Sequence, residues 1–211
     1  MTRSPQSAPS ASQLIRFAAI AVPIYAAAQP VAAYLPAIMA KDFGLSLGTL
    51  GLLMLVGQMI NSMLDPVIGT LSDHTRARFG RRRTWIAAGG LTFTAGAVLL
   101  FFPPPDGSIA WLATGLLLFY AGSSAVQTPL LAWSGELSSD YHQRTRITAY
   151  ITVLVAVALV VTLAVAAVGD RLFQGDGRMR LALFGALVLV TALPGLWLTL
   201  TAAPDRPAEW V

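Results

Sequence analysis

One acidic residue, Asp65, lies deep within a long apolar stretch of this sequence. A carboxylate surrounded by hydrocarbon is costly to keep unless it faces a polar cavity or a partner, so an acid in such a place indicates a function. The side chain could hold a coupling cation in either of two ways. A buried carboxyl group favours its neutral form and can exchange a proton. Alternatively, its oxygens and those of Asn61, four residues earlier, could bind a sodium ion.

Three polar side chains precede Asp65 on the same helical face. They are Gln58, Asn61 and Ser62, and they share that face because residues three, four and seven apart lie on one side of a helix. In a lipid-embedded helix such a stripe must face protein or water. The alternative interpretation is a set of structural hydrogen bonds to a neighbouring helix.

A second polar stripe occurs on a later apolar segment. This stripe consists of four residues within about one third of the helical circumference: Tyr120, Ser123, Ser124 and Gln127. Thr128 and Trp133 fall outside this stripe. Earlier in the chain, Tyr25 and Gln29 share a face between two prolines. Packing of helices through small polar residues could explain the second stripe as well. We expect the stripes to line one substrate cavity through Gln58, Tyr25, Gln29, Tyr120, Ser124 and Gln127.

Charged residues gather immediately after the segment that holds Asp65. Five arginines fall between residues 76 and 83, and a smaller charged group lies near residues 136–146. We interpret these groups as a network that closes a gate at the helix ends, formed by Asp73, Arg76, Arg81, Arg82, Arg83, Glu136 and Arg144. The alternative is a set of surface ion pairs, each worth about 0–1 kcal/mol.

The elements that must position these residues are membrane-spanning helices. Charged residues make up only 11% of the chain and apolar residues 55%, whereas soluble domains carry about 25% charged residues. Spanning helices need roughly 20 apolar residues, and the sequence provides six such segments, at 14–40, 48–72, 84–103, 109–133, 147–169 and 181–203. No alternating pattern of a membrane barrel occurs. We therefore expect an all-α integral membrane protein.

The basic residues also predict an orientation. Of the 14 lysines and arginines, ten belong to one side of the expected bundle and four to the other. Because basic residues are retained in the cytoplasm, both termini are expected inside. Residues 1–13 then form a disordered cytoplasmic tail and residues 204–211 a second cytoplasmic tail.

Several functions are disfavoured by the composition. The chain has no cysteine, which excludes a thiolate metal site, and its two histidines make a zinc site unexpected. No phosphate-binding glycine loop, catalytic triad or paired carboxylates occur, so we expect no enzyme and no cofactor beyond the coupling ion. The basic residues lie in short connections between spans, where they set topology, so nucleic acid is not an expected partner.

The pattern around Asp65 resembles that of a known family. It runs Asp65-Pro66-x-x-Gly69-x-x-Ser72-Asp73-x-x-Arg76-x-Arg78-x-Gly80-Arg81-Arg82-Arg83-x-Trp85. This closely resembles the signature of the glycoside–pentoside–hexuronide:cation symporters, the melibiose-permease-like branch of the major facilitator superfamily. Residues 129–146 resemble the junction between the fourth and fifth helices of that family.

The resemblance implies a fold, a cation site and a missing partner. The family has twelve helices in two six-helix halves with the substrate between them, and this chain resembles the N-terminal half. The family's cation site uses two acids four residues apart. Asp65 matches the second, but the first is Asn61 here, which leaves proton coupling at least as plausible as sodium coupling. The second half would be a separate chain, a missing C-terminal half or another copy of this chain.

Together these features predict a cation-coupled transporter of a small organic solute, such as a sugar or glycoside, in the inner (plasma) membrane. Its partners would be the lipid bilayer, the solute and a second six-helix half. Two alternatives stay open at this point. One is a half-permease that serves as a non-transporting subunit or scaffold, and the other is a transporter of lysolipids or similar amphiphiles.

Overall fold

The structure of the chain is a computed structural model that describes residues 10–75, 77, 79–105, 107–136 and 141–202. All regular structure within these residues is helical. In chain order the elements are α1 (Ala11–Ala18), α2 (Ala21–Gln29), the π-helix η1 (Pro30–Tyr34), α3 (Leu35–Phe43), α4 (Leu47–His74), α5 (Arg81–Phe101), α6 (Ile109–Glu136), α7 (Tyr141–Leu172) and α8 (Gly177–Ala202). They include six helices long and apolar enough to span a membrane, as the sequence predicted.

The first apolar segment, predicted as one span over 14–40, is interrupted twice in the structure. A two-residue turn separates α1 from α2, and the π-helical turn η1 separates α2 from α3. Pro23 and Pro30 explain these interruptions, because proline has no N–H for the helical hydrogen bond. By contrast, α4 continues through Pro66 without a break.

The N-terminal tail is shorter than predicted. α1 begins at Ala11, where Ser10 and Gln13 form a reciprocal capping box that satisfies the first backbone N–H groups. Residues 11–13 are therefore helical and do not belong to a disordered tail. The remaining predicted tail residues, 1–9 and 204–211, lie outside the described part of the chain.

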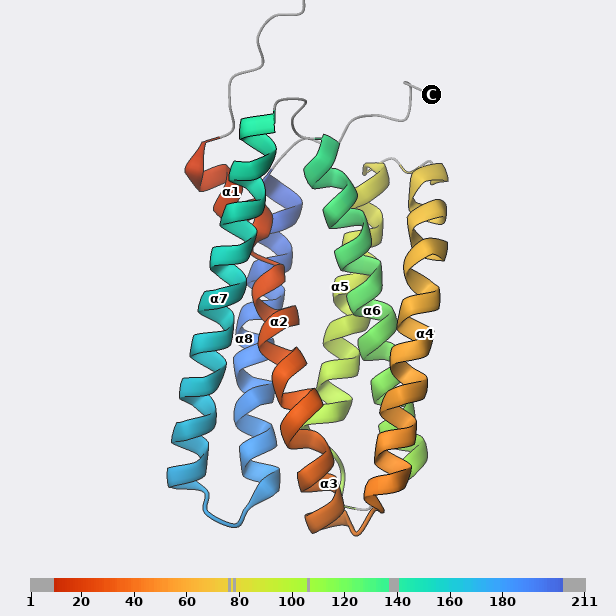
Figure 1. The fold of residues 1–211 in the computed structure, drawn as a ribbon, viewed down its shortest axis with the longest axis vertical. Helices are drawn as coiled ribbons and strands as arrows, with labels where there is room; N and C mark the ends of the chain where they lie inside the picture. The colour runs from red at the N-terminus through yellow and green to blue at the C-terminus, as the bar shows by residue number, and fades with distance from the viewer. Residues whose placement is uncertain (1–9, 76, 78, 106, 137–140, 203–211) are drawn as a thin grey trace, which may run out of the picture.

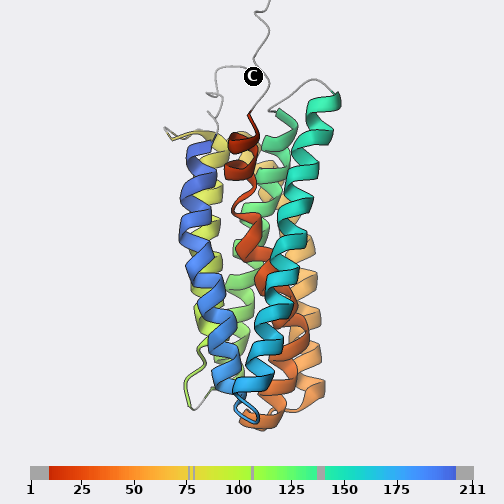
Figure 2. The ribbon, with the colours of Figure 1, turned by 90° about the vertical axis from the view of Figure 1, so that its left-hand side faces the viewer.

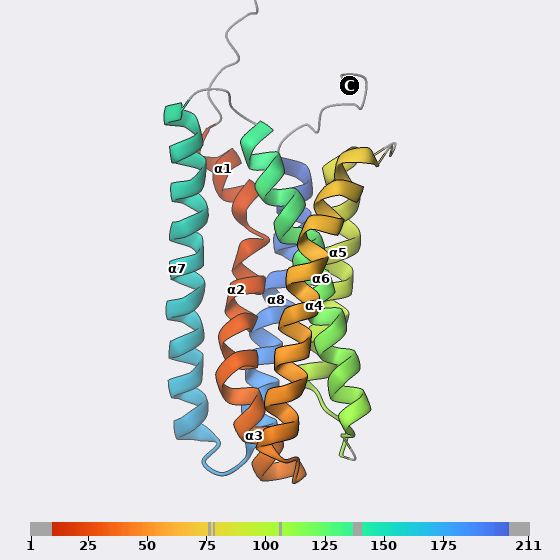
Figure 3. The ribbon, with the colours of Figure 1, turned by 45° about the vertical axis from the view of Figure 1, so that its right-hand side comes forward.

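The spans stand side by side in two groups. In Figure 1, α2, α7 and α8 lie on one side and α4, α5 and α6 on the other, and α5 packs against α8 to join the groups. Figures 2 and 3 show that the start of α1 and the end of α8 lie at one end of the bundle, together with the connection from α4 to α5. The connections from α3 to α4 and from α7 to α8 lie at the opposite end.

Glycines bring α5 and α6 into close contact. A Cβ atom added to Gly122 would lie 2.2 Å from the backbone nitrogen of Phe93, and one added to Gly96 would lie 2.4 Å from that of Phe119. Without a side chain at these positions the two backbones can approach closely. The rings of Phe93 and Phe119 pack beside them with centroids 5.1 Å apart. This contact fixes the position of α6 within the bundle.

Two spans are peripheral. Within the 18-residue apolar stretch of each span, only 11% of the residues of α4 and 17% of those of α7 are buried, whereas 39–50% are buried in the other four spans. Large apolar side chains along the outer side of α4 are exposed, among them Leu52, Met59, Met63 and Val67. These two helices therefore offer apolar surface to lipid or to another protein.

Substitution of Gly122 should loosen the bundle. We expect Gly122→Ala to force α5 and α6 apart and to destabilise the fold by about 1–3 kcal/mol, as overpacking does. The readout is the midpoint of thermal unfolding in detergent. Gly51→Ala is the matched control, because a Cβ there meets nothing within 4 Å. Equal midpoints for the two variants would contradict the proposed contact.

Candidate functional site

Asp65 lies within α4 and is held by two hydroxyl groups of α6. Ser124 Oγ donates to Asp65 Oδ1, and Thr128 Oγ1 donates to the same oxygen over 3.3 Å. The carboxylate is half-buried. Among the described residues no arginine or lysine pairs with it. The acid is thus stabilised by neutral donors, which leaves its charge uncompensated by any side chain of the described part.

The register between α4 and α6 follows from small residues on α4. A Cβ at Gly57 would lie 2.7 Å from the ring of Tyr120, and one at Gly69 would lie 3.5 Å from the methyl carbon of Thr128. Tyr120, Ser124 and Thr128 are spaced four residues apart, so one face of α6 meets α4 over about two turns. The glycines let α6 approach near enough for its hydroxyls to reach the carboxylate.

Thr128 corrects the sequence interpretation. The pattern placed it outside the polar stripe of α6, yet its hydroxyl contacts Asp65 on α4. The stripe divides in the structure, since Ser124 faces α4 while Gln127 faces α2. Ser123 is buried and its hydroxyl bonds to the carbonyl oxygen of Tyr120 in its own helix. The spacing of four between Tyr120, Ser124 and Thr128 was the signal that could have found Thr128.

Asn61 lies one turn before Asp65 and provides a second oxygen. Its side-chain Oδ1 is buried and has no hydrogen-bond partner among the described residues. A buried amide oxygen without a donor is unfavourable unless a ligand or water meets it. No group of three or more histidine, aspartate or glutamate side chains that could hold a metal occurs in the described part. The donor set near Asp65 is therefore one carboxylate with amide and hydroxyl oxygens.

A second polar contact joins α2 to α6. Tyr25 donates from its hydroxyl to Gln127 Oε1 over 3.2 Å, and its side chain is exposed. Because Gln127 and Ser124 lie on neighbouring turns, α6 links this contact to the one at Asp65. In Figure 1, α6 stands between α2 and α4. We call this set the polar strip, and it consists of Tyr25, Gln127, Ser124, Thr128 and Asp65.

Other predicted cavity residues flank the polar strip. Gln29 and Gln58 are exposed and their side chains make no hydrogen bond to a described residue. Ser62 donates to the carbonyl oxygen of Gln58 in its own helix. Tyr120 packs its ring against Gly57 and Phe119. The structure thus links the Tyr25–Gln127 contact and the Ser124–Asp65 contact through α6, whereas the side chains of Gln29 and Gln58 make no such contact within the described residues.

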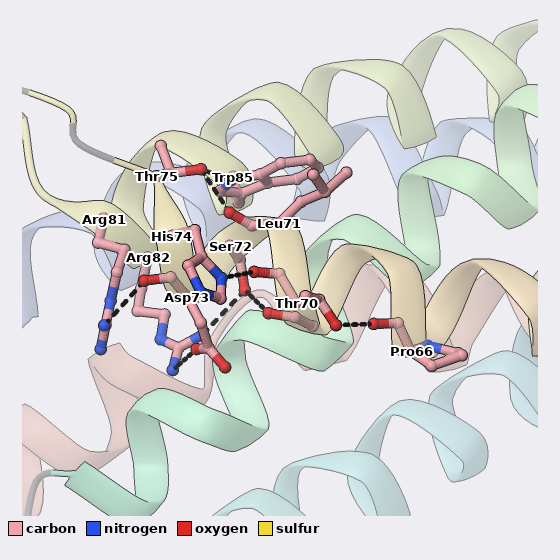
Figure 4. Close-up of polar contacts among 11 residues, drawn as sticks. Pro66, Thr70, Leu71, Ser72, Asp73, His74, Thr75, Arg81, Arg82 and Trp85 are labelled. Carbon is pink, nitrogen blue, oxygen red and sulfur yellow. Dashed lines mark hydrogen bonds and ion pairs between the residues drawn. The ribbon is translucent and has the colours of Figure 1, made fainter.

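Part of the predicted charge network forms where α4 ends and α5 begins (Figure 4). Arg82 is buried, donates to Ser72 Oγ over 2.8 Å and pairs with Asp73 Oδ1 at 2.5 Å. Arg81 donates to the backbone oxygen of Asp73 over 3.1 Å. Trp85 Nε1 donates to Thr75 Oγ1 over 2.8 Å. The turn between the two helices is therefore tied at several points.

The other members of that network lie elsewhere or outside the described residues. The guanidinium of Arg83 stands over the ring of Trp133 on α6, 5.9 Å from its centroid. Arg76 is outside the described residues, and the structure does not describe the side chains of Glu136 and Arg144. Sequence reasoning missed the role of Ser72, a fully buried hydroxyl that receives the Arg82 guanidinium.

Comparison with known proteins identifies the family. Residues 16–209 match the family described as "MFS/sugar transport protein". The chain is 29% identical over 153 residues to "Putative glycoside/cation symporter YagG" of Escherichia coli (strain K12), which covers 70% of this chain and 33% of the relative. It is 31% identical over 105 residues to "Inner membrane symporter YicJ" of the same organism, covering 48% of this chain and 23% of the relative.

A relative from a different bacterium gives a similar result. "Uncharacterized symporter YnaJ" of Bacillus subtilis (strain 168) is 34% identical over 109 residues, covering 52% of this chain and 23% of the relative. The matched region is at most 33% of the length of these three relatives. Since the family match extends over nearly the whole sequence, the chain belongs to the MFS/sugar transport family, and its six spans form half of a major facilitator fold.

Removal of the Arg82 side chain should open the turn between α4 and α5. Arg82→Ala leaves the buried Ser72 hydroxyl and the Asp73 carboxylate without their shared donor, at a cost of about 1–3 kcal/mol. We expect chymotrypsin to cleave after the exposed Phe79 several times faster in this variant. Arg171→Ala removes an exposed arginine from α7 and should leave the rate unchanged. Equal cleavage rates for Arg82→Ala and the unmodified chain would contradict the role of Arg82.

Proposed function

We propose that this chain is one half of a cation-coupled secondary transporter that moves a small, sugar-like solute across a membrane. Membership of the MFS/sugar transport family and the symporter names of the relatives support the proposal. The observation that carries it is the state of Asp65, a half-buried carboxylate within a span that has hydroxyl partners and no described cationic one. A charge maintained in such a place is characteristic of ion handling.

Asp65 would bind the coupling cation. Its Oδ2 accepts no hydrogen bond from a described residue, and Asn61 Oδ1 is likewise without a donor. Oxygen ligands of this type suit a hard cation such as sodium. A proton on the carboxyl group would neutralise the same charge without any further ligand. The hydroxyls of Ser124 and Thr128 can serve both cases, since each can donate to a carboxylate or turn a lone pair toward a bound ion.

The solute would bind along the polar strip and its neighbours. The candidate side chains are Tyr25, Gln29, Gln58, Tyr120, Ser124 and Gln127. They are hydroxyl and amide groups, which both donate and accept hydrogen bonds, and thus they match the many hydroxyls of a neutral sugar. The name of the relative YagG refers to a glycoside, which is the same class of solute.

A second six-helix half would complete the pathway. The exposed apolar sides of α4 and α7 would pack against it, and rocking of the two halves would open the polar strip to each side of the membrane in turn. Pairing would also place Asp65 between two bundles. In the covered state, removal of water would strengthen every interaction of the carboxylate with its cation.

We also propose an orientation and a gate. The end of the bundle with the α4–α5 turn would face the cytoplasm, because the arginines concentrate there. At that end, Arg82 and Asp73 would hold the turn as part of an inward gate. The membrane would be the inner (plasma) membrane, in line with the printed name of YicJ.

The test of this function is gradient-driven uptake by the paired protein in sealed vesicles. A panel of radiolabelled neutral monosaccharides and methyl glycosides serves as probe, with an imposed sodium or proton gradient. We expect Asp65→Asn to reduce the accumulation ratio to about one, because a neutral amide has no negative charge to balance a bound cation and cannot take up a proton as a carboxylate does. The variant keeps Oδ1 as an acceptor for the hydroxyls of α6, so insertion and folding should be spared.

Ser123→Ala is the matched control for that experiment. It alters a buried hydroxyl on α6 that bonds within its own helix, and it should leave the accumulation ratio unchanged. Uphill uptake by Asp65→Asn at the level of the unmodified protein would refute the assignment of the cation site. Absence of any gradient-driven uptake in a folded, paired protein would favour a non-transporting subunit instead.

A further inference from the structure

The two interruptions of the first span leave backbone groups that need partners. In an unbroken helix the N–H of each residue bonds to the carbonyl four residues earlier, and Pro30 has no N–H to give to Ala26. At the turn between α1 and α2, the N–H of Ile20 and the last carbonyls of α1 leave the helical pattern as well. Within a membrane no water is present to satisfy such groups, so protein must do so.

Thr199 of α8 satisfies the first interruption. Its hydroxyl oxygen accepts from the backbone N–H of Ile20 over 3.0 Å, and the hydroxyl proton can be donated to Phe17 O at 3.1 Å or Arg16 O at 3.2 Å. The side chain is completely buried. Gly195, one turn earlier on α8, makes room for this approach, because a Cβ there would lie 3.0 Å from Ala19 O. One hydroxyl thus bridges α1, α2 and α8.

Thr162 of α7 satisfies the second interruption. Its hydroxyl lies 2.8 Å from Ala158 O in its own helix and 3.3 Å from Ala26 O, the carbonyl to which Pro30 has no N–H to donate. The side chain is 1% exposed. Because a hydroxyl has one proton, Thr162 shares it between its own helix and α2. The carbonyl of Ala26 therefore has a donor supplied from a neighbouring helix.

The consequence is that α2 is a short separate segment held at both of its ends. Thr199 joins its first residues to α8, and Thr162 joins its last turn to α7. Tyr25 and Gln29, on the exposed side of this segment, are candidate solute ligands. Their position relative to α6 depends on where the two bridges hold α2, as the contact between Tyr25 and Gln127 shows.

We propose that Thr162 and Thr199 are positioning residues of the transport site, which hold α2 so that Tyr25 and Gln29 meet the solute. This role rests on the proposed function, since it acts on a solute site assigned there. The hydroxyl is the group that matters in each case, whereas the methyl group fills space. Valine has the shape of threonine without the hydroxyl, and serine keeps the hydroxyl, so the pair of substitutions separates the two contributions.

The first experiment measures the position of α2 and needs no transport. Because the sequence contains no cysteine, spin labels can be attached at Ala28→Cys on α2 and Leu131→Cys on α6, both exposed positions. Their distance distribution is measured by pulsed electron resonance on the chain in lipid nanodiscs. We expect a narrow distribution for the parent, a broadened or shifted one for Thr162→Val and Thr199→Val, and recovery of the narrow one for both serine variants.

Thr191→Val is the matched control. Thr191 lies on α8 and its hydroxyl bonds only within that helix, to Leu187 O and Val188 O, among the described residues. Its loss should leave the distance distribution narrow. If Thr199→Val does not fold, Thr162→Val still tests the proposal. The Thr162 hydroxyl contacts a single backbone carbonyl of α2, so its loss should leave the other backbone hydrogen bonds in place. A parent-like distribution for folded Thr162→Val would overturn the proposal.

The second experiment measures uptake in vesicles with the radiolabelled glycoside panel. For the valine variants we expect KM to rise on the order of tenfold, with the maximal rate per folded protein within about twofold of the parent, because ligand groups are displaced while the cation site is intact. Serine should restore KM. Displaced labels with an unchanged KM would overturn the positioning role. Failure of the unmodified protein to transport would overturn the proposed function itself, and the spin-label result distinguishes the two failures.

Discussion

The interior of a membrane supplies no hydrogen-bond partners, and the arrangement of this bundle follows from that constraint. A polar group within a span must find a partner in its own helix, in another helix or in a ligand. Ser124 and Thr128 of α6 provide donors for the carboxylate of Asp65 on α4. These partners fix how α6 stands against its neighbour, and glycines such as Gly57 allow the close approach that the short side chains require. The second oxygen of the carboxylate and Asn61 Oδ1 have no described hydrogen-bond donor, and there the proposed cation would bind.

The same constraint explains which features the sequence could predict. Spanning helices follow from the length of apolar segments, so the six spans were predictable, and an acid within one of them stood out from composition alone. The partner of that acid was less predictable. Spacing along α6 shows which residues share a face, but not which neighbouring helix the face meets, and so the contact of Thr128 with Asp65 was not predicted. The prolines of the first span are visible in the sequence, but the threonines that contact its interruptions come from α7 and α8, more than 100 residues away.

The distribution of burial connects the site to the rest of the family's architecture. α5 and α6 are closely packed, with backbones that approach each other at Gly96 and Gly122. α4 is tied to this pair on one face and exposes apolar side chains on the other, and α7 is similarly exposed. Asp65 therefore lies on a helix that would contact both halves of a complete transporter. A cation at Asp65 could influence the contact between halves directly, through the helix that carries it.

Carboxyl modification of Asp65 tests the central claim most directly. N,N′-dicyclohexylcarbodiimide reacts with protonated carboxyl groups in apolar surroundings, and mass spectrometry of peptides locates the adduct. The account predicts an adduct on Asp65 in the folded protein, and protection of Asp65 by saturating sodium at constant pH where sodium is the coupling cation. Complete resistance of Asp65 to the reagent in a folded protein would contradict a reactive, cation-binding carboxylate at this position.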